Sequence, residues 1–183
     1  MNNGALQYFQ DIATAIRTAS LAPDLDGIAS SARSLIAQFA GRRRAPCIRL
    51  RQRYLAALRA MSAEPAWTLD EVKRQRIKLV SRYAANGNRL IPDAVPVVGG
   101  LDEALLVDLL WPSVQRELED YLDFRRLRGE EAALQGLRPL AMAYDREQWQ
   151  ESRAAEAAWI AHMRACGQAS YLAAQAPAMF RIH

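Results

Sequence analysis

The sequence predicts an all-α protein, a single-domain bundle of about six to eight helices with a buried proline- and glycine-containing connection. Apolar residues recur at three- and four-residue spacing through almost every segment, which is the period of an amphipathic helix. No stretch alternates apolar and polar residues as a half-buried strand would. The 183 residues are 51% hydrophobic and 24% charged, which is the balance of a globular protein rather than of a disordered one.

Three helices are predicted before residue 63. The first covers about residues 4–20 and carries Phe9 on its apolar stripe. Asp24 is placed to cap the N-terminus of the second helix, which Gly41 ends. The third helix covers about residues 47–62, where apolar side chains lie on one side and arginines on the other.

The fourth predicted helix has a capping signal at its start. Thr68 and Glu71 have the spacing of a capping box, in which each side chain bonds the backbone N–H of the other residue. Trp67 and Val72 lie where a hydrophobic staple would pack against this box. The pattern predicts a helix that begins here and continues to about residue 85.

The fifth predicted helix, about residues 101–127, contains Pro112, which would kink it or begin a second helix. Its first part, residues 101–110, is apolar almost all round, with Asp108 the main exception. A helix of this kind is buried in the centre of a protein or at the interface with a partner.

The sixth predicted helix begins with a second capping box, formed by Asp145 and Gln148. Tyr144 and Trp149 take the positions of its hydrophobic staple. This helix ends near Gly167. The predicted domain covers residues 1–176, followed by a flexible tail at 177–183.

One segment joins the fourth and fifth helices and combines prolines, glycines and acids. It contains Leu-Ile-Pro-Asp at 90–93, then Pro96, Gly99 and Gly100, and then Leu-Asp-Glu at 101–103. This text resembles the signature of the YkvA-like family, a bacterial domain of unknown function, over about residues 83–118. The resemblance implies a helical domain, often labelled membrane-associated, with no established activity. Arg89 stands where that family usually has an acidic residue, and Glu103 stands where it has Asp.

The residue types of this segment can be explained by its backbone alone. Prolines block a regular helix, and glycines permit a positive φ where the chain reverses. An acid near a helix start can accept hydrogen bonds from free N–H groups, and one after a proline can accept them from amides two residues on. The structural motif in this interpretation is Pro92, Asp93, Pro96, Gly99, Gly100 and Asp102. The alternative is a metal-assisted enzyme that uses Asp93, Asp102 and Glu103.

Charge is distributed unevenly along the chain. Residues 1–89 contain 15 basic and 6 acidic side chains, a net of +9, whereas residues 90–183 contain 9 and 14, a net of −5. The basic patch that we single out is Arg42, Arg43, Arg44, Arg49 and Arg53. One hypothesis is that it meets nucleic-acid phosphate or an anionic membrane surface. The alternatives are a solvated face, or docking on acidic residues between 117 and 123.

Three charged residues lie on apolar stripes, and we predict that they are buried: Arg76, Arg125 and Glu156. A buried charge needs a partner because desolvation of an isolated charge is costly. We therefore expect Arg76 or Arg125 to pair with Glu156, Asp93 or Asp102. The alternative is that only the aliphatic stem of each arginine is covered.

No arrangement in the sequence predicts catalysis. There is no serine elbow, glycine-rich phosphate loop or zinc-ligand spacing, and no orienting acid is evident beside His162 and Cys166. We predict no catalytic residue, no cofactor and no small-molecule substrate. The expected function is non-enzymatic, that of an adaptor, regulator or immunity-type factor that binds an unidentified protein partner. The alternatives are the anionic partners and the metal-assisted enzyme named above.

Location is predicted from segments that the sequence lacks. We see no signal peptide and no run of about 20 uncharged apolar residues of the kind that spans a membrane. Cys47 and Cys166 lie in apolar helical contexts that favour reduced thiols. We expect a cytoplasmic protein, with peripheral membrane association as the alternative.

Overall fold

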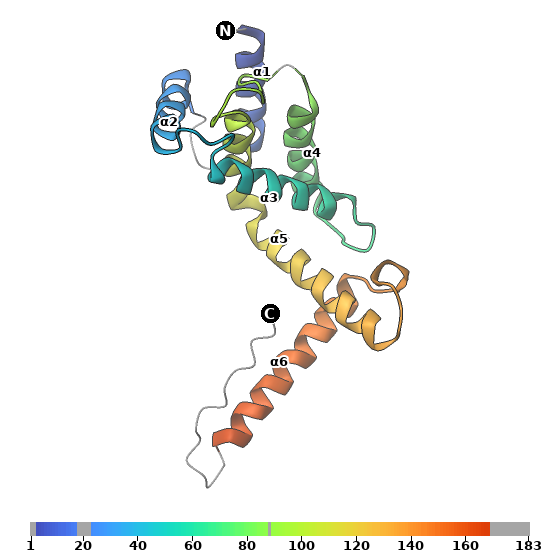
Figure 1. Ribbon diagram of the computed structural model, residues 1–183. Coiled ribbons are helices and arrows are strands. Elements are labelled where there is room, and N and C mark those ends of the chain that lie inside the picture. The colour runs from blue at the N-terminus through green and yellow to red at the C-terminus, as the bar shows by residue number, and fades with distance from the viewer. Residues whose placement is uncertain (1–2, 18–22, 88, 169–183) are drawn as a thin grey trace. The chain divides into compact units, whose positions relative to one another are not determined.

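The computed structural model describes residues 3–17, 23–87 and 89–168. Within these ranges it contains six α-helices, one short 3-10 helix and no strand (Figure 1). The prediction of an all-α fold with about six to eight helices is therefore confirmed. The chain divides into two compact units, Met1–Asp123 and Phe124–His183. The predicted domain limits, 1–176, stay a prediction, and the predicted tail at 177–183 lies outside the described residues.

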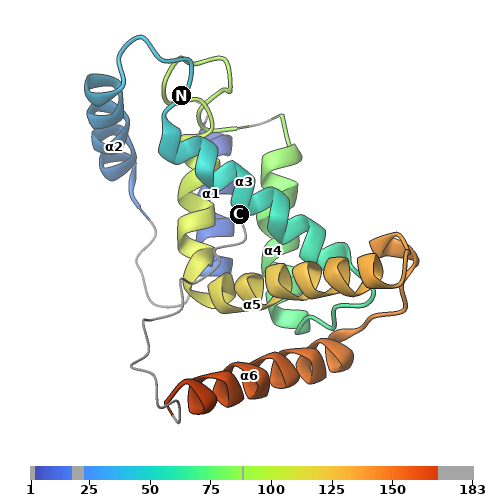
Figure 2. The same ribbon diagram turned by 60° about the horizontal axis from the view of Figure 1, so that its bottom comes forward.

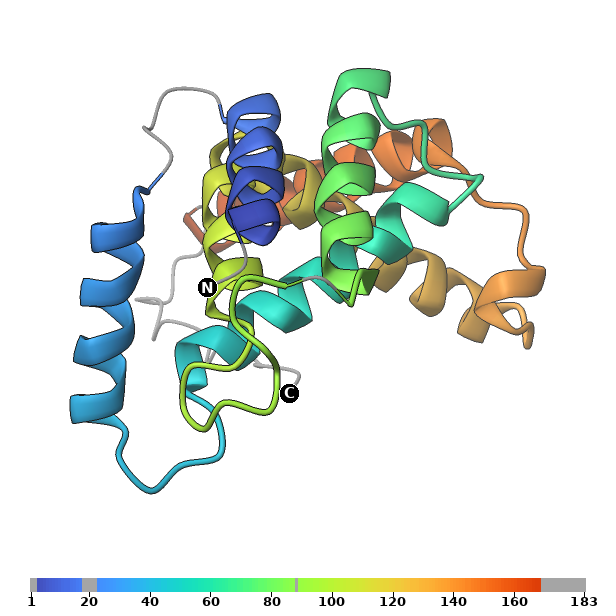
Figure 3. The same ribbon diagram turned by 90° about the horizontal axis from the view of Figure 1, so that it is seen from above.

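The first unit contains four whole helices and the beginning of a fifth. They are α1 (Asn3–Ile16), α2 (Leu25–Gln38), α3 (Pro46–Ala63), α4 (Glu71–Ala85) and α5 (Leu101–Leu134), of which the last continues into the second unit. Helix α4 packs against both α1 and α3. Figure 3 shows α2 to one side of these three helices.

The core of this unit is formed by the apolar stripes that the sequence predicts. Its largest fully buried side chains include Phe9 and Ile16 of α1, Leu55 and Leu58 of α3, Ile77 of α4, and Leu106 and Leu110 of α5. Burial of each such side chain contributes roughly 1.5–3 kcal/mol before the entropy of ordering is subtracted. The apolar residues 101–110 therefore lie in the protein core, and of the two predicted locations, centre or partner interface, the structure has the first.

The start of α4 differs from its prediction. The cap is Asp70, whose carboxylate accepts a hydrogen bond of 3.1 Å from the backbone N–H of Lys73, so the capping box at Thr68 was wrong. The predicted staple is absent as well, because Trp67 is fully buried while Val72 is 58% exposed. Asp caps at least as well as Thr, and a start two residues later places Val72 on the outer side of the first turn.

Helix α5 runs through its proline. It extends from Leu101 to Leu134 with Pro112 inside it, and the direction of its axis changes part-way along its length (Figure 2). Proline removes one backbone hydrogen bond and bends a helix without necessarily ending it. Ser113 Oγ donates a hydrogen bond of 2.7 Å to the carbonyl of Leu110 beside it. The kinked alternative of the prediction is the one observed.

The second unit contains the rest of α5, the short helix η1 (Pro139–Ala141) and α6 (Arg146–Gln168). The capping box before α6 is confirmed. Asp145 Oδ1 accepts a hydrogen bond from the N–H of Gln148 at 3.0 Å, and Gln148 Oε1 accepts one from the N–H of Asp145 at 2.9 Å. Both predicted staple residues, Tyr144 and Trp149, are buried.

Across the part of the chain that the structure describes, every helix is too short or too polar to cross a membrane.

Candidate functional site

The loop between α4 and α5 is a series of tight turns. The N–H of Val98 donates to the carbonyl of Pro96 at 2.8 Å, and Val97 between them has a φ of 68°. This is a γ-turn with a β-branched residue in the left-handed region, a strained conformation that only its surroundings can hold. The N–H of Gly99 donates to the carbonyl of Val95 at 2.9 Å and closes the next turn.

Both predicted glycine positions require glycine. A Cβ on Gly99 would lie 2.5 Å from the carbonyl oxygen of Asp93, and Gly100 has a φ of 80°. The prediction of a buried connection is correct only for its second half, because residues 97–100 are buried whereas residues 92–96 are exposed. The exposed half contains Pro92, Asp93 and Pro96. Here the charged side chain of Asp93 and the backbone beside the two prolines stay in contact with water.

Asp102 is completely buried and holds this loop against α4. Its Oδ2 accepts hydrogen bonds from the Tyr83 hydroxyl at 2.6 Å and from the N–H groups of Leu90 at 2.9 Å and Ile91 at 3.2 Å. It does satisfy free N–H groups as predicted, but these belong to the loop rather than to the first turn of α5. Burial raises the pKa of Tyr83. The hydrogen bond that Tyr83 donates to Asp102 and the negative charge of Asp102 raise this pKa further.

Asp93 is bound by two guanidinium groups. Arg44 Nη2 lies 3.2 Å from its Oδ1, and Arg89 donates to its Oδ2. The prediction that Asp93 bonds amides two residues on was therefore wrong, because charged donors reach both of its oxygens and form stronger hydrogen bonds. Arg89 also donates to the carbonyl of Ala84 at the end of α4, and its Nη1 lies 3.7 Å from Oε2 of Glu103.

These contacts form a connected set of side chains, which we call the Arg89 network: Arg44, Gln52, Arg89, Asp93 and Glu103. Arg44 Nη1 donates to Gln52 Oε1 at 2.8 Å, and Arg89 connects Asp93 with Glu103. Burial raises the pKa of Glu103, although the charge of Arg89 and the polar side chain of Gln52 oppose that rise. The network joins α3, α4 and α5 through the loop.

The three predicted metal-ligand candidates do not converge. Asp93 and Glu103 share Arg89, while Asp102 turns to Tyr83 and the loop amides. No group of three or more His, Cys, Asp or Glu in the described ranges is arranged to hold a metal ion. The physical reason is Arg89, whose guanidinium already provides the positive charge between two of the acids.

The prediction that Arg76, Arg125 and Glu156 are buried was wrong. Arg76 is half-buried, Arg125 and Glu156 are exposed, and neither arginine forms an ion pair within the described residues. Glu156 pairs instead with Arg126 at 3.1 Å, one residue from the predicted partner. The apolar stripes misled because they extend to exposed side chains at the helix ends, such as Val72.

Within the described ranges, the charged side chains that are buried are Asp102, Glu103, Glu117 and Arg128. None of these four was among the three buried charges predicted from the sequence. Arg128 lies over the ring of Phe124, with 4.8 Å between its guanidinium carbon and the ring centroid. Their four-residue spacing on one helix is a signal that could have found this cation–π pair. Glu117 pairs with Lys73 at 2.9 Å, a contact between α4 and α5 that spacing does not encode.

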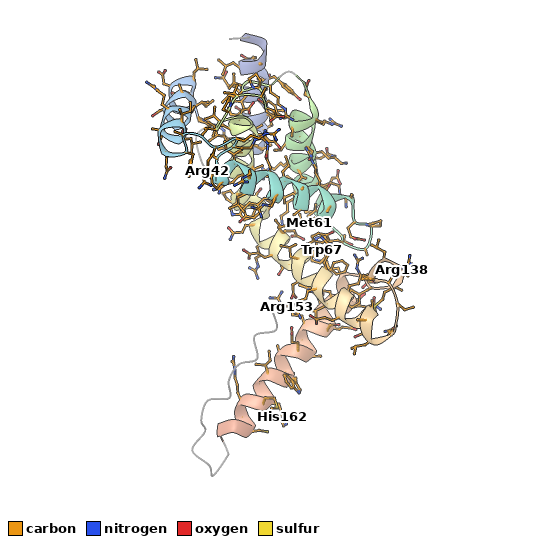
Figure 4. All side chains as sticks on the ribbon, viewed as in Figure 1. Arg42, Met61, Trp67, Arg138, Arg153 and His162 are labelled. Atoms are coloured by element: carbon orange, nitrogen blue, oxygen red, sulfur yellow. The ribbon has the colours of Figure 1, made fainter. Side chains whose placement is uncertain are left out.

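Four of the five predicted basic-patch residues gather around one hollow, which we call the arginine hollow. Its volume is about 530 Å³, and it is lined by Arg42, Arg43, Arg44, Arg49 and Gln52. Arg53 is exposed on α3 and does not line it. Figure 4 shows Arg42 beside the loop that precedes α3.

The arginines of this hollow differ in their partners. Arg44 is held by Asp93 and Gln52. Arg42 lies 6.0 Å from the centroid of the Phe39 ring, and within the described ranges no acidic side chain pairs with Arg42, Arg43 or Arg49. Helix α3 begins here with a cap, Ala45, that offers no side-chain hydrogen bond to the first turn. The positive end of the helix dipole thus adds to the charge of the arginines.

The backbone fixes the arginine hollow next to the loop. The N–H of Ala45 donates to the carbonyl of Val97 at 2.9 Å, and the N–H of Val97 donates to the carbonyl of Arg43 at 3.0 Å. These two hydrogen bonds form an isolated parallel β-bridge between Arg44 and Val97. The strained residue of the loop is therefore the one that positions the arginines.

A Cys–His pair lies on α6. His162 Nε2 is 3.5 Å from Cys166 Sγ, and both side chains are exposed. Figure 4 shows the position of His162 on α6. Among the described side chains, none orients His162 by a carboxylate hydrogen bond, so this pair lacks the third group of a nucleophilic site.

Comparison of the chain with family models, with curated proteins and with solved structures finds no match. The resemblance to the YkvA-like signature accordingly stays a prediction based on the motif alone.

Proposed function

We propose that this protein is a non-enzymatic binding protein that holds phosphate groups of an anionic partner in the arginine hollow. The observation that carries the proposal is the gathering of Arg42, Arg43 and Arg49 around one concave site without an acidic partner in the described ranges. Like charges placed together cost free energy through mutual repulsion. An anion would relieve that repulsion, and the guanidinium fork matches phosphate oxygens in pairs.

The surroundings support this proposal because they fix Arg44 and the backbone that carries its neighbours before a ligand arrives. Arg44 is fixed by Gln52 and Asp93, and the preceding backbone is fixed by its hydrogen bonds to Val97. A site whose side chains are already ordered loses less conformational entropy on binding. The positive end of the α3 dipole favours the same ligand, since helix N-termini bind anions.

The test replaces Arg42, Arg43 and Arg49 together with Gln and measures binding of a fluorescent duplex DNA fragment across a series of salt concentrations. Vesicles of phosphatidylglycerol form the second arm and distinguish a lipid headgroup from a nucleic-acid phosphate. We expect salt-sensitive binding by the wild type in one arm. In the DNA arm, the logarithmic salt slope should fall by about 2–3, close to one phosphate contact for each arginine removed.

The matched control replaces Arg82, Arg116 and Arg125, all exposed and outside the hollow, with Gln. It makes the same change in net charge. If the two triple variants weakened binding equally, binding would depend on net charge alone and the hollow would have no special role. An absence of salt-sensitive binding in both arms would refute the proposal.

A second candidate function is the protein–protein binding expected from the sequence, and α6 supports it. Trp159, Ile160 and Met163 are 63%, 38% and 51% exposed, and they occupy one face of the helix. Large apolar side chains grouped on a surface often mark an interface. The test is cross-linking of the protein to its partners in the native cell. We expect the variant Trp159→Ala to lose a partner that the control variant Glu147→Ala retains. Retention of the partner by both variants would count against this face of α6.

A further inference from the structure

A second concave surface is lined by α2 and the loop and has a different chemistry. It is an open groove of about 420 Å³ between α2 and the loop. Its lining is Leu25, Ile28, Ala29, Ala32 and Arg33 of α2, with Leu90, Ile91 and Val98 of the loop. Seven of these eight residues are apolar, and the eighth carries a positive charge.

The groove exists because α2 packs loosely. Of its 14 residues only Ile28 is buried, and Figure 3 shows the helix to one side of α1, α3 and α4. The loop cannot close the gap, because Gly99 already packs against the backbone of Asp93 and Leu90 and Ile91 are tied to Asp102. The loop side of the groove is thus fixed by contacts within the loop and with Asp102.

We infer that this groove binds a single-chain anionic amphiphile, with its hydrocarbon chain against α2 and the loop and its anionic head at Arg33. The volume lies within the range of small-ligand sites, which combine an apolar lining with a few polar groups that orient the ligand. Among the described lining residues Arg33 is the only charged one, and it selects a negative head. Its Nε donates to the carbonyl of Ala29, another lining residue, at 3.3 Å.

This inference does not depend on the proposed function. The two concave surfaces share no lining residue, so either one can bind its ligand while the other is empty. The arginine hollow is lined by four arginines and so offers several guanidinium groups, which suits a phosphate. The groove offers one charge and an apolar length, which suits a fatty acid.

The test is calorimetric titration of the full chain with dodecanoate below its micelle concentration. Dodecanol serves as the uncharged ligand. We expect saturable binding of one dodecanoate, with about fivefold weaker binding for dodecanol and for the variant Arg33→Gln, as for an exposed ion pair. Arg82→Gln removes an exposed arginine outside the groove and should bind as the wild type does.

Ala32→Trp fills the groove and should abolish binding. Ala29→Leu is the second variant if circular dichroism finds that the first one fails to fold, and it should weaken binding at least tenfold. The inference is overturned if the wild type shows no saturable binding, or if a folded filled variant binds as tightly as the wild type. Loss of binding in the Arg42, Arg43 and Arg49 triple variant alone would also overturn it, since the ligand would then occupy the arginine hollow.

Discussion

The Arg89 network and the arginine hollow lie side by side and use the same residue type in opposite ways. In the network, Arg44 and Arg89 are each bonded to an acid and to a second acceptor. In the hollow, Arg42, Arg43 and Arg49 have no acidic partner within the described ranges. We expect a charge whose partners are already present to contribute to stability, and we propose that the exposed charges of the hollow contribute to binding instead. The comparison therefore predicts different outcomes for substitutions only a few residues apart.

The largest expected effect concerns the backbone that both regions share. Gly99→Ala would place a Cβ 2.5 Å from a carbonyl oxygen that cannot move aside, and we expect it to lower the free energy of unfolding by about 3 kcal/mol. Gly129→Ala is the control, because its Cβ meets nothing within 4 Å inside α5 and should stabilise by about 0.5–1 kcal/mol. Urea unfolding measures both, and a tolerated Gly99→Ala would contradict the tight loop.

Next in size is the loss of the buried carboxylate. Asp102→Asn should cost about 2 kcal/mol, since it removes the charge that accepts three hydrogen bonds at one oxygen. Asp108→Asn is the matched control, as Asp108 is half-exposed and pairs with Arg51, so that it should cost less than about 1 kcal/mol. Thermal unfolding of both variants at one pH decides, and equal losses would show that burial gives Asp102 no special role.

The comparison itself is tested by two arginines. Arg89→Ala should cost about 1–2 kcal/mol because it leaves Asp93 and the buried Glu103 without their shared cation. Arg43→Ala should change stability by less than about 0.5 kcal/mol and yet weaken anion binding. Stability is measured by urea unfolding and binding by fluorescence anisotropy. If Arg43→Ala destabilised the protein as much as Arg89→Ala, the division into structural and binding arginines would fail.

The smallest effect is a pH dependence at Glu103. Its folded pKa is raised above the usual value near 4.5, so the fold favours the neutral acid. The stability contribution of this group is therefore fully present below the unfolded pKa and is lost as pH rises through the folded pKa. Wild type should gain stability relative to Glu103→Gln as pH falls from about 7 to about 4. Parallel pH profiles of unfolding for the two proteins would contradict this expectation.

What could be predicted from the sequence depended on how far apart the interacting residues lie in the chain. The capping box of Asp145 and Gln148 spans three residues and was predicted correctly, because helix geometry alone brings its groups together. The partners of Asp102 lie 11, 12 and 19 residues away, and only the packing of the loop against α4 selects them. The sequence indicated an acid that accepts hydrogen bonds there, but it could not identify the donors.

The candidate sites divide in the same way. Arg42, Arg43 and Arg44 are consecutive and Arg49 lies one turn into α3, so a basic cluster was evident from the sequence. The distinction between Arg44 and its neighbours was not, because it depends on Asp93, 49 residues later. Similarly, Glu156 was assigned to Arg125 rather than Arg126, since the choice depends on how α5 and α6 are rotated within the second unit.

The two hydrogen bonds that connect Val97 with Arg43 and Ala45 have a mechanical consequence. They clamp the segment before α3 to a residue whose own torsion angle is unfavourable, so neither strand of the bridge can shift without releasing the other. An anion bound in the arginine hollow would restrain residues 43–45, and it would therefore slow the opening of the γ-turn at Val97 as well. The amide protons of Ala45 and Val97 would then exchange with solvent as one cooperative unit, although the two residues lie in separate loops, before α3 and before α5.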